Sequence, residues 1–493
     1  MWQDAKNIYH LFVAVLANAW CGFPSRKLIV IGVTGTDGKT TTVNAIFHIL
    51  KTAGLPVSMI STTGAVINGK DYDVGFHVTT PSSWAVQRFL KQAAVADSFS
   101  SSGSCQSFSS RQCSSKSHPA FAGVERLRAV GNPSNSATPH SNENFESSPR
   151  HNHRYMVLEL TSHALDQYRD WGINYEVGVL TNITNEHLDY HKTYEKYVKA
   201  KSILLKRSKV AIINRDDRSY EYICKLKNLF RSHSGKRSAS RIFAFCRFWT
   251  SQNDKKRVVA YGLKNKADFD INDLPSGLDL AEFNKYNLLA AIAACKSLGV
   301  KDEDIKKGAK SFVPPLGRLQ TVYHKDFDVM IDFAHTPNGF EQLLSSIRPS
   351  VKGRIIHVFG SAGERDSRKR LEMGKISSKY SDIIILTAED PRSESIDEIN
   401  KQIISGIQKS IHIFRHAEFN SASQKILHYV QDDNGRKYLI EIQDRQEAIN
   451  IAVKMAEKGD LVLLTGKAHE KSMNYGKGEL PWSEHEAVKK ALI

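Results

Sequence analysis

A glycine- and threonine-rich loop at residues 32–42, GVTGTDGKTTT, carries the residue types best suited to binding phosphate. Backbone N–H groups in such a loop can surround phosphate oxygens at the start of a helix. Lys39 would add a positive charge, and the hydroxyl of Thr40 or Thr41 could bind Mg²⁺. The loop departs from the strict Walker pattern, because Val33 stands where that pattern has its first glycine.

The sequence on both sides of the loop supports a nucleotide-binding role. An apolar run at residues 24–35 predicts a strand before it, and apolar residues at helical spacing predict a helix over 39–52. A structural turn with an incidental lysine is the alternative. A strand before the loop and a helix after it favour ATP binding in an α/β domain.

Two further side chains could hold a second Mg²⁺ beside this loop. Glu159 ends an apolar strand at residues 156–160, and His187 lies in a polar turn. A carboxylate oxygen and an imidazole nitrogen can bind a metal ion together. The spacing of His187 and His191 is also compatible with zinc, but no cysteine or H-E-x-x-H pattern supports it. Two turn histidines that form hydrogen bonds are the remaining alternative.

Composition and charge restrict the class of protein. At roughly 150 residues per domain, a chain of 493 residues corresponds to about three domains. It has no run of ~20 apolar residues, so no membrane span is expected. The six scattered cysteines favour a reducing, cytoplasmic environment. A net charge of +16 suits polyanionic partners, either nucleic acid or substrates with several phosphates.

The C-terminal third alternates apolar runs with stretches of helical spacing. Near-continuous apolar runs are typical of parallel strands that are covered on both faces. We therefore expect a second α/β domain of Rossmann-like type, with polar groups at the carboxyl ends of its strands. The expected strands are residues 329–335, 354–360, 381–390 and 460–467, and the expected helices are 339–347, 369–380, 396–409 and 446–458.

Three stretches interrupt these periodic segments. Residues 97–153 are rich in serine and lack strand or helix periodicity, which predicts a disordered insertion. Residues 226–257 and 416–433 are expected to be irregular surface loops. Basic residues with interleaved aromatic residues in the second stretch could bind single-stranded nucleic acid, but a solvated loop is favoured.

Several segments together resemble the Mur ligase family, the ATP-dependent amino-acid ligases of peptidoglycan synthesis. The loop matches the family pattern G-T-[ND]-G-K-T-T. The segment at 332–340 (DFAHTPNGF) resembles the family signature D-Y-A-H-T-P. The segments at 158–169 (LELTSHALDQYR), 179–205 and 387–392 (TAEDPR) resemble the branch that adds a diamino acid. The folylpolyglutamate synthetases are related ligases, but the SHALDQ and EDPR segments favour the muropeptide branch.

The resemblance implies a central P-loop ATPase domain with a mostly parallel sheet and a C-terminal Rossmann-like ligase domain. The central domain is expected at residues 26–312 and the C-terminal domain at 313–493, with an irregular insertion at about 414–436. Residues 1–25 are expected to form a short helical segment in place of most of the small UDP-binding domain.

The resemblance also implies roles for individual residues. The catalytic residues would be Lys39, Glu159, His187 and Lys201. ATP would contact Gly35, Thr36, Asp37, Gly38, Lys39, Thr40, Thr41, Asn287, Arg318, Asp332 and His335. The UDP-muramoyl-peptide would contact Thr79, Thr80, Thr161, Gln167 and Arg169, and the amino-acid substrate Arg365, Asp390, Pro391, Arg392, Gly466 and Glu470. Mg²⁺ would be held by Thr40, Glu159, His187 and Lys201 as its carbamate.

This chain departs from the family pattern at several of these positions. Asp37 replaces the usual Asn, Phe333 replaces Tyr, and Ala362 replaces Gly. Asp390 also stands where Asn is usual, which bears on the choice of amino acid. Arginine binds carboxylates well, so Arg392 favours meso-diaminopimelate, with its second carboxylate, over lysine.

The reaction implied by the resemblance is the ATP-dependent addition of a diamino acid to UDP-N-acetylmuramoyl-L-alanyl-D-glutamate through an acyl phosphate. The expected enzyme is a cytoplasmic monomer that acts on small molecules and binds neither nucleic acid nor membrane. Three alternatives remain: a folylpolyglutamate synthetase-like ligase, a P-loop ATPase that binds nucleic acid, and an inactive paralogue.

Overall fold

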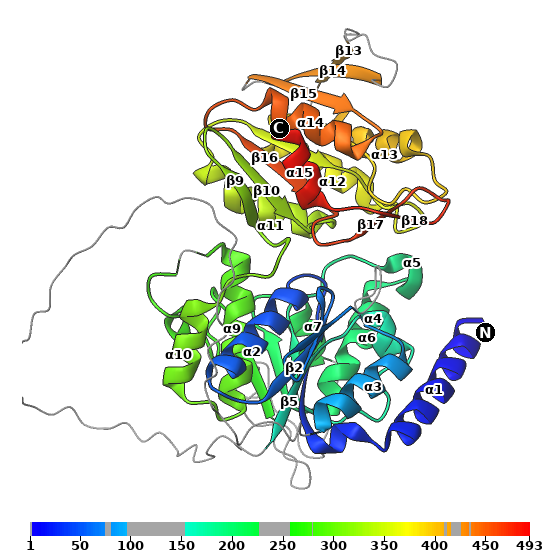
Figure 1. Ribbon diagram of the computed structural model, residues 1–493, viewed down its shortest axis with the longest axis vertical. Coiled ribbons are helices and arrows are strands. Elements are labelled where there is room, and N and C mark those ends of the chain that lie inside the picture. Colours follow the sequence, from blue (N-terminus) through cyan, green and yellow to red (C-terminus); the bar gives the residue numbers. More distant parts are fainter. Residues whose placement is uncertain are drawn as a thin grey trace, which may run out of the picture. The chain divides into compact units, whose positions relative to one another are not determined.

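The computed structural model describes residues 2–73, 80–95, 153–225, 257–278, 280–408, 412–415, 425–432 and 435–493. Within these residues the chain forms two eight-stranded sheets and one small two-stranded sheet (Figure 1). None of the helices in this described part is long and apolar enough to cross a membrane.

The first sheet is built from the N-terminal half of the chain. Its strand order is β4-β3-β2-β5-β1-β6-β7-β8, with β2 and β5 to β8 parallel to β1, and with β3 and β4 added antiparallel at one edge. The strands are β1 (Leu28–Thr34), β2 (Val57–Ser61), β3 (Gly64–Ile67), β4 (Lys70–Tyr72), β5 (Arg154–Glu159), β6 (Tyr175–Leu180), β7 (Ser208–Asn214) and β8 (Arg257–Tyr261).

Helices cover both faces of this sheet because its central strands are apolar on both sides. Ile29 and Ile31 of β1 pack in one hydrophobic cluster with α2 and α9, whereas Leu28 and Val30 pack in another with α3. The helices are α1 (Trp2–Cys21), α2 (Lys39–Thr52), α3 (Ser83–Ala94), α4 (Ser162–Asp166), α5 (Leu188–His191), α6 (Tyr194–Arg207), α7 (Ser219–Lys225), α9 (Glu282–Ser297) and α10 (Asp302–Ser311). Short 3₁₀ helices span Pro24–Lys27 and Ile271–Asp273.

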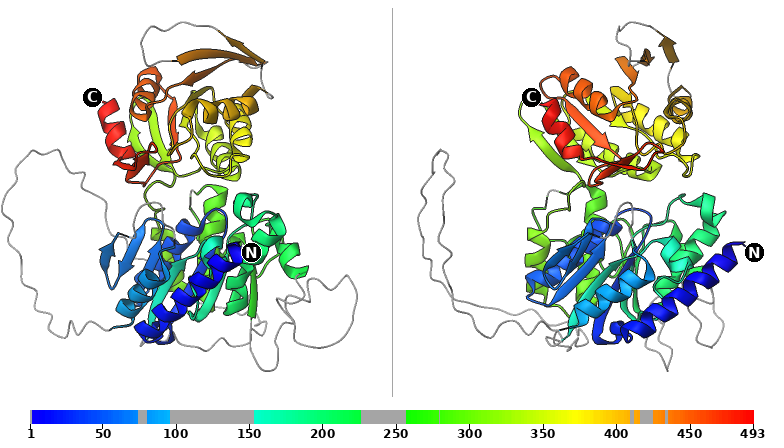
Figure 2. Two further views of the ribbon diagram at one scale, coloured as in Figure 1. Left: turned by 90° about the vertical axis from the view of Figure 1, so that its right-hand side faces the viewer. Right: turned by 45° about the vertical axis from the view of Figure 1, so that its right-hand side comes forward.

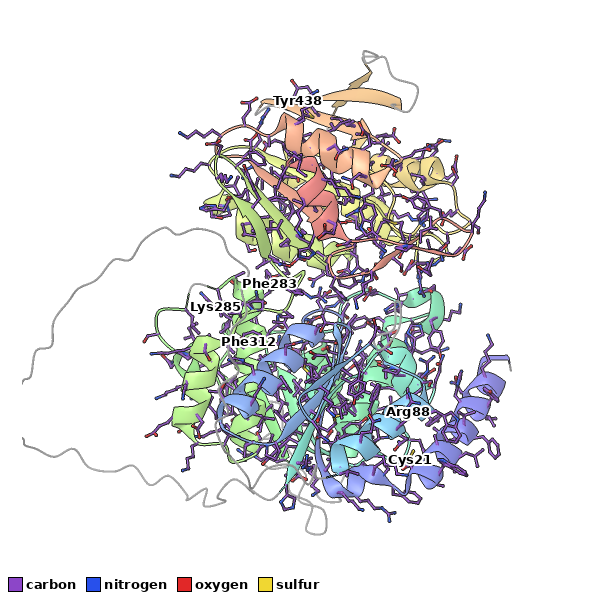
Figure 3. All side chains as sticks on the ribbon, viewed as in Figure 1. Cys21, Arg88, Phe283, Lys285, Phe312 and Tyr438 are labelled. Carbon is purple, nitrogen blue, oxygen red and sulfur yellow. The ribbon has the colours of Figure 1, made fainter. Side chains whose placement is uncertain are left out.

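The first helix, α1, lies against α3 (Figure 1, Figure 2). Figure 3 marks Cys21, the last residue of α1, and Arg88 on α3. The side chain of Asn18 donates a hydrogen bond to the Trp171 carbonyl oxygen at 3.1 Å, and that of Asn7 donates one to Asp166 at 3.2 Å. These contacts anchor α1 on the segment around α4.

The second sheet is formed by the C-terminal part of the chain. Its order is β13-β14-β15-β12-β11-β16-β10-β9, in which β15, β12, β11, β16 and β10 are parallel and the strands at both edges are antiparallel. The strands are β9 (Gln320–His324), β10 (Asp328–Asp332), β11 (Ile355–Phe359), β12 (Ile383–Leu386), β13 (His412–Arg415), β14 (Lys425–Asp432), β15 (Gly435–Glu441) and β16 (Leu461–Thr465). The small sheet pairs β17 (Ser472–Asn474) with β18 (Glu479–Pro481).

Two hydrophobic clusters cover the faces of the second sheet. One contains α14 and α15, and the other contains α11, α12 and α13. The helices are α11 (Pro337–Ile347), α12 (Lys369–Tyr380), α13 (Ile396–Gln408), α14 (Arg445–Met455) and α15 (Glu484–Ala491), and a 3₁₀ turn spans Arg348–Ser350. The α/β fold class with two mostly parallel sheets is therefore confirmed.

One structural expectation was wrong. Much of the stretch at about 414–436 that was expected to be irregular forms β14 and β15, an antiparallel pair that continues the sheet beyond β12. The run KILHYVQD at 425–432 is rich in residues that favour strands, which the surrounding polar segments obscured. Residues 97–152 and 226–256, expected to be insertions, lie outside the described residues.

Parallel pairing brings the carboxyl ends of several strands to one edge of each sheet. Val33 of β1 is in register with Glu159 of β5, so the phosphate loop begins beside a carboxylate. In the second sheet Asp332 of β10 is in register with Thr465 of β16, and Phe359 of β11 with Leu386 of β12. The loops that follow these strands carry the expected site residues, as the position of ligand sites in parallel sheets predicts.

Candidate active site

The phosphate loop is held in a conformation that requires glycine. Gly38 has a φ of 78°, in the left-handed region, and α2 begins at the next residue, Lys39. A Cβ atom on Gly38 would lie only 2.1 Å from Oδ1 of Asn287 on α9. Nζ of Lys39 donates a hydrogen bond to the Thr36 carbonyl oxygen at 2.7 Å. The loop and the helix of Asn287 are therefore in close contact, as expected for two parts of one nucleotide site.

Two residues that directly follow β6 form hydrogen bonds to the backbone of the phosphate loop. The Thr181 hydroxyl and the Asn182 amide both donate hydrogen bonds to the Asp37 carbonyl oxygen, at 2.7 and 3.0 Å. Oδ1 of Asn182 accepts a hydrogen bond from the Asp37 N–H at 3.0 Å. The loop is thus fixed by the neighbouring strand as well as by its own sequence.

The carboxylate of Asp37, which replaces the usual Asn, is bound by the start of α11. It accepts hydrogen bonds from the Thr336 hydroxyl at 3.2 Å and from the Asn338 amide at 2.7 Å. Burial and the nearby Glu186 raise the pKa of Asp37. These contacts show how the chain accommodates an extra carboxyl group in a phosphate loop.

A connected set of polar groups joins the loop to the C-terminal part of the chain. Glu159 is buried, and its Oε1 accepts hydrogen bonds from the hydroxyls of Thr40 at 3.1 Å and Thr62 at 2.8 Å. Nη2 of Arg318 donates a hydrogen bond to the Thr40 hydroxyl at 3.2 Å. The Arg318 guanidinium also lies 4.7 Å from the ring centroid of Phe333. This cation–π contact needs no hydroxyl, so Phe333 can replace Tyr in this role.

Three histidines around the loop are held in the neutral form. Burial, with the positive charge of Lys201, lowers the pKa of His187 to about 3. Burial, with the neighbouring His187, lowers the pKa of His163 to about 4, and burial with Lys369 lowers that of His335 to about 4. Neutral imidazoles can bind a metal ion or accept hydrogen bonds at physiological pH.

Lys201 lies beneath the loop on α6 and is 2% exposed. Its Nζ donates a hydrogen bond to the Gly35 carbonyl oxygen and lies 4.6 Å from the ring centroid of Tyr197. Burial and the charge of Lys39 lower the pKa of Lys201 well below its usual range. The negative charges of Glu186 and Asp37 act in the opposite direction, but burial and Lys39 outweigh them.

The expected amino-acid site contains an ion-pair network built on a fully buried lysine. Nζ of Lys467 lies 2.8 Å from Oδ1 of Asp390 and 2.6 Å from Oε2 of Glu470. Oδ1 of Asp390 also accepts a hydrogen bond from the Asn474 N–H at 3.0 Å. Lys467 therefore balances the negative charge that Asp390 introduces where Asn is usual.

Arg365 and Arg392 also belong to the expected amino-acid site, and both line the cavity. Nη1 of Arg392 donates a hydrogen bond to the Gly363 carbonyl oxygen. Burial, together with the charge of Arg392, lowers the pKa of Arg365. The two guanidinium groups repel each other, and a bound carboxylate would relieve that repulsion.

One cavity of about 700 Å³ brings most of the expected residues together. Phe283, at the start of α9 and marked in Figure 3, lines it as well. Among the expected residues, those that line the cavity are Thr36, Asp37, Gly38, Lys39, Thr40, Thr41, Thr80, Glu159, Thr161, Arg169, His187, Asn287, Arg318, Asp332, His335, Arg365, Asp390, Arg392, Gly466 and Glu470. Four expected residues that the structure describes do not line the cavity: Gly35, Gln167, Lys201 and Pro391.

The residues expected to contact the muramoyl-peptide are partly brought together. Oγ1 of Thr80 donates a hydrogen bond to the Glu159 carbonyl oxygen and accepts one from the Thr161 N–H, both at 3.1 Å. Nη1 of Arg169 donates a hydrogen bond to the Thr80 carbonyl oxygen at 3.5 Å. Gln167 is buried outside the cavity lining, and Thr79 lies outside the described residues.

Sequence reasoning missed several cavity residues. Asn182 and Glu186 follow β6, Asp216 follows β7, and Glu389 follows β12. Each lies just beyond the carboxyl end of a parallel strand, so the strand-end rule could have identified all four. Lys369, at the start of α12, had no such signal.

The fold and this cavity define an ATP-binding α/β protein with a phosphate loop. Two family models match the chain: the Mur ligase middle domain over residues 33–99 and 127–295, and the Mur ligase glutamate ligase domain over residues 317–468.

Curated relatives extend this likeness along almost the whole chain. UDP-N-acetylmuramoyl-L-alanyl-D-glutamate--2,6-diaminopimelate ligase 1 of Clostridium acetobutylicum is 32% identical over 97% of this chain and 80% of its own length. The corresponding ligase of Aquifex aeolicus is also 32% identical, with the same coverage of both chains. A bifunctional folylpolyglutamate synthase/dihydrofolate synthase of Yersinia pestis shares the fold, with a TM-score of 0.57 and 14% identity over 92% of this chain and 90% of its own.

The chain belongs to the Mur ligase family. It is an ATP-dependent amide ligase, as the sequence analysis predicted.

Proposed function

We propose that this ligase joins meso-diaminopimelate to the glutamate carboxylate of UDP-N-acetylmuramoyl-L-alanyl-D-glutamate. The observation that carries the proposal is the shared cavity, whose wall includes the phosphate-loop residue Lys39 at one part and Arg365 and Arg392 at another. An acyl phosphate formed at the loop would then lie within the same space as an incoming amino acid. The names of the two curated relatives support this choice of substrates.

Different residues of the cavity would have different roles in this reaction. Lys39 and Arg318 would hold the phosphates of ATP and stabilise charge during phosphoryl transfer to the substrate carboxylate. Arg169 and Thr80 would hold the muramoyl-peptide beside Glu159. The enclosing cavity would exclude water, which would otherwise hydrolyse the acyl phosphate.

Mg²⁺ fits the groups beside the loop. The hydroxyl of Thr40 and the carboxylate of Glu159 lie 3.1 Å apart on the cavity wall, and the neutral imidazole of His187 lines the same cavity. Within the described residues no group of three or more His, Cys, Asp or Glu side chains could hold a metal alone. Such a small set of ligands suits Mg²⁺, which is usually held by one or two protein groups together with substrate phosphates. When bound, the ion would neutralise part of the negative charge of the phosphates.

ADP release tests the proposal directly. The protein should release ADP with UDP-N-acetylmuramoyl-L-alanyl-D-glutamate and meso-diaminopimelate, and the product should gain the mass of one diaminopimelate residue. Parallel reactions with lysine, and with folate plus glutamate, distinguish the lysine-adding and folate-linked alternatives. Turnover with folate plus glutamate alone would contradict the proposal.

Replacing Arg392 by alanine tests the choice of amino acid. We expect kcat/KM for meso-diaminopimelate to fall by about 10- to 100-fold, because a charge-assisted hydrogen bond to its second carboxylate is lost. The value for lysine should change little, since lysine has no such carboxylate. Arg368→Ala, which removes an exposed arginine paired with Asp366, is the matched control. Equal losses for both amino acids would show that Arg392 does not select the substrate.

A further inference from the structure

The first turns of α1 lie at the edge of the first sheet that carries the cavity. Only residues 22–27 connect α1 to β1, and this short connection turns the chain back, so that α1 runs towards α4 and α5 at its N-terminal end (Figure 1). The side-chain amide of Asn7 donates a hydrogen bond to Oδ2 of Asp166, the last residue of α4. Since α4 follows β5, this contact places the start of α1 beside the carboxyl ends of the strands.

A series of contacts leads from the phosphate loop to this part of α1. The side chain of Glu159 accepts a hydrogen bond from Thr40 of the loop, and the Glu159 carbonyl oxygen accepts one from the Thr80 hydroxyl. The Thr80 carbonyl oxygen in turn accepts one from Arg169. Arg169 lines the cavity, and its charge acts on His10 of α1. The surface beyond Arg169 is therefore formed in part by α1.

Basic side chains gather at this place. Lys6 and His10 are four residues apart on α1, so they share one face of the helix. Lys6 is exposed and His10 is partly exposed. Burial, together with the positive charges of Arg169 and Lys6, lowers the pKa of His10. A bound anion would offset this repulsion and would interact favourably with all three groups.

An acidic side chain, Asp166, also lies here, and hydrogen-bond donors surround it. Its Oδ2 accepts hydrogen bonds from Asn7 at 3.2 Å and from the Tyr190 hydroxyl at 2.8 Å. Lys6 and Arg169 carry two positive charges against this one negative charge. Among these side chains positive charge therefore exceeds negative charge.

An exposed aromatic ring adjoins the basic groups. Tyr9 is 64% exposed, and the centroid of its ring lies 5.6 Å from that of the His10 ring. An aromatic side chain on which a base can stack, beside cations that attract phosphates, is the combination that binds nucleotides. These residues of α1 therefore suit a nucleoside diphosphate better than a simple anion.

We propose that Lys6 and His10 of α1, together with Arg169, bind the diphosphate of UDP-N-acetylmuramoyl-L-alanyl-D-glutamate, and that its uracil ring stacks on Tyr9. The inference rests on the proposed function, which supplies this nucleotide-linked substrate. The glutamate carboxylate of the substrate must reach the phosphate loop to be phosphorylated, and the nucleotide is at the opposite end of the molecule. The contacts from the loop through Arg169 to α1 follow the same order.

Alanine variants of the two α1 residues test the diphosphate contacts. In Lys6→Ala and in His10→Ala we expect KM for the UDP-linked substrate to rise by about 10-fold, because a charge-assisted hydrogen bond is lost. The kcat value should stay within about twofold of wild type, since an interaction far from the reacting atoms is equally strong in the ground and transition states. KM for ATP and for meso-diaminopimelate should not change. Lys27→Ala, at an exposed lysine beyond the other end of α1, is the matched control.

A substrate without the nucleotide separates this role from a structural one. N-acetylmuramoyl-L-alanyl-D-glutamate keeps the glutamate carboxylate and lacks UDP. Wild type should ligate it with a KM at least about 10-fold higher, and Lys6→Ala and His10→Ala should match wild type with it. A variant in which α1 is merely misplaced would instead lose activity with both substrates.

Binding of UDP supplies a readout that does not depend on turnover. UDP is added to histidine-labelled protein whose phosphate loop is already occupied by one equivalent of ADP with Mg²⁺. We expect UDP to shift the NMR resonances of the His10 ring and to raise the pKa of His10, because negative phosphates favour the imidazolium. Uridine, which has no phosphate, should do neither.

Tyr9→Ala tests the stacking of the base. We expect the affinity for UDP to fall by about 10-fold, the usual effect of losing one stacked aromatic ring. Trp20→Ala, which removes an exposed aromatic residue at the other end of α1, should leave the affinity unchanged.

The failure of this site and the failure of the proposed function give different results. Wild type that ligates the UDP-linked substrate, with KM unchanged in both Lys6→Ala and His10→Ala, would refute the site alone. Equal losses with and without the nucleotide, or UDP that leaves the His10 resonances in place, would refute it as well. Wild type that releases no ADP with either muramoyl substrate, but whose His10 resonances respond to UDP and not to uridine, would refute the proposed function and support a nucleotide site on α1.

Discussion

Replacing Lys39 by alanine should reduce ligation by about a thousandfold or more, the largest loss expected from a single change in this chain. Lys39 is the first residue of α2, and its Nζ lies at the mouth of the phosphate loop, 2.7 Å from the Thr36 carbonyl oxygen. Phosphoryl transfer depends on positioning and on charge stabilisation more than on covalent chemistry, so a missing cation raises the barrier directly. The measurement is ADP release with all three substrates at saturating concentrations.

The fold should survive this substitution, which allows the kinetic effect to be interpreted. Alanine favours helices, and the side chain of Lys39 donates a hydrogen bond only within its own loop in the described part of the chain. The Tm of Lys39→Ala should therefore lie within a few degrees of wild type. Lys51→Ala, at an exposed lysine of the same helix, is the matched control and should leave turnover unchanged. Near-normal turnover of Lys39→Ala would show that the loop is a structural turn.

Much of the fold could be predicted because local patterns and sheet topology agree here. The helix expected at 369–380 is α12 with the same bounds, and the helix expected at 39–52 is α2. The position of Glu159 beside the phosphate loop also followed from its place at the end of an apolar strand, because parallel strands bring their carboxyl ends together. Periodicity and strand-end position are both properties of short segments.

The parts that could not be predicted depend on contacts between distant segments. The partner of Asp390 is Lys467, which is 77 residues away, and only the alignment of β12 with β16 through β11 brings the two loops together. The loops of Glu389 and Gly466 are also far apart in the sequence, yet a Cβ atom on Gly466 would lie only 2.4 Å from Oε2 of Glu389. No spacing rule in a single sequence contains this information.

Departures from the family pattern illustrate the same limit. Asp37, Phe333 and Asp390 each depart from the family pattern, and each has a specific contact in the structure that accommodates it. Asp37 accepts hydrogen bonds from the start of α11, and Asp390 forms an ion pair with Lys467. The Arg318 guanidinium forms a cation–π contact with the ring of Phe333. A substitution in a polar site is therefore better judged by its partners than by the family consensus.

Lys201→Ala should lose most ligase activity, for a reason specific to this buried lysine. A positive charge at a 2% exposed position, beside a second lysine, is unfavourable, and burial with the charge of Lys39 lowers the pKa of Lys201. A larger fraction of the amine is therefore neutral, and only the neutral amine reacts with CO₂. We propose that the product, a carbamate, serves as a negatively charged Mg²⁺ ligand beneath the phosphate loop.

The rescue pattern separates this role from simple packing. Formate or acetate should partly restore the activity of Lys201→Ala by occupying the space that the carbamate would fill. Lys201→Arg should not be rescued, because guanidinium fills that space with positive charge and does not form the carbamate. Lys199→Ala, at an exposed position of α6, should behave as wild type with or without carboxylates. If Lys201→Ala ligates at the wild-type rate without additives, Lys201 acts only through its hydrogen bond to Gly35 and the carbamate assignment is wrong.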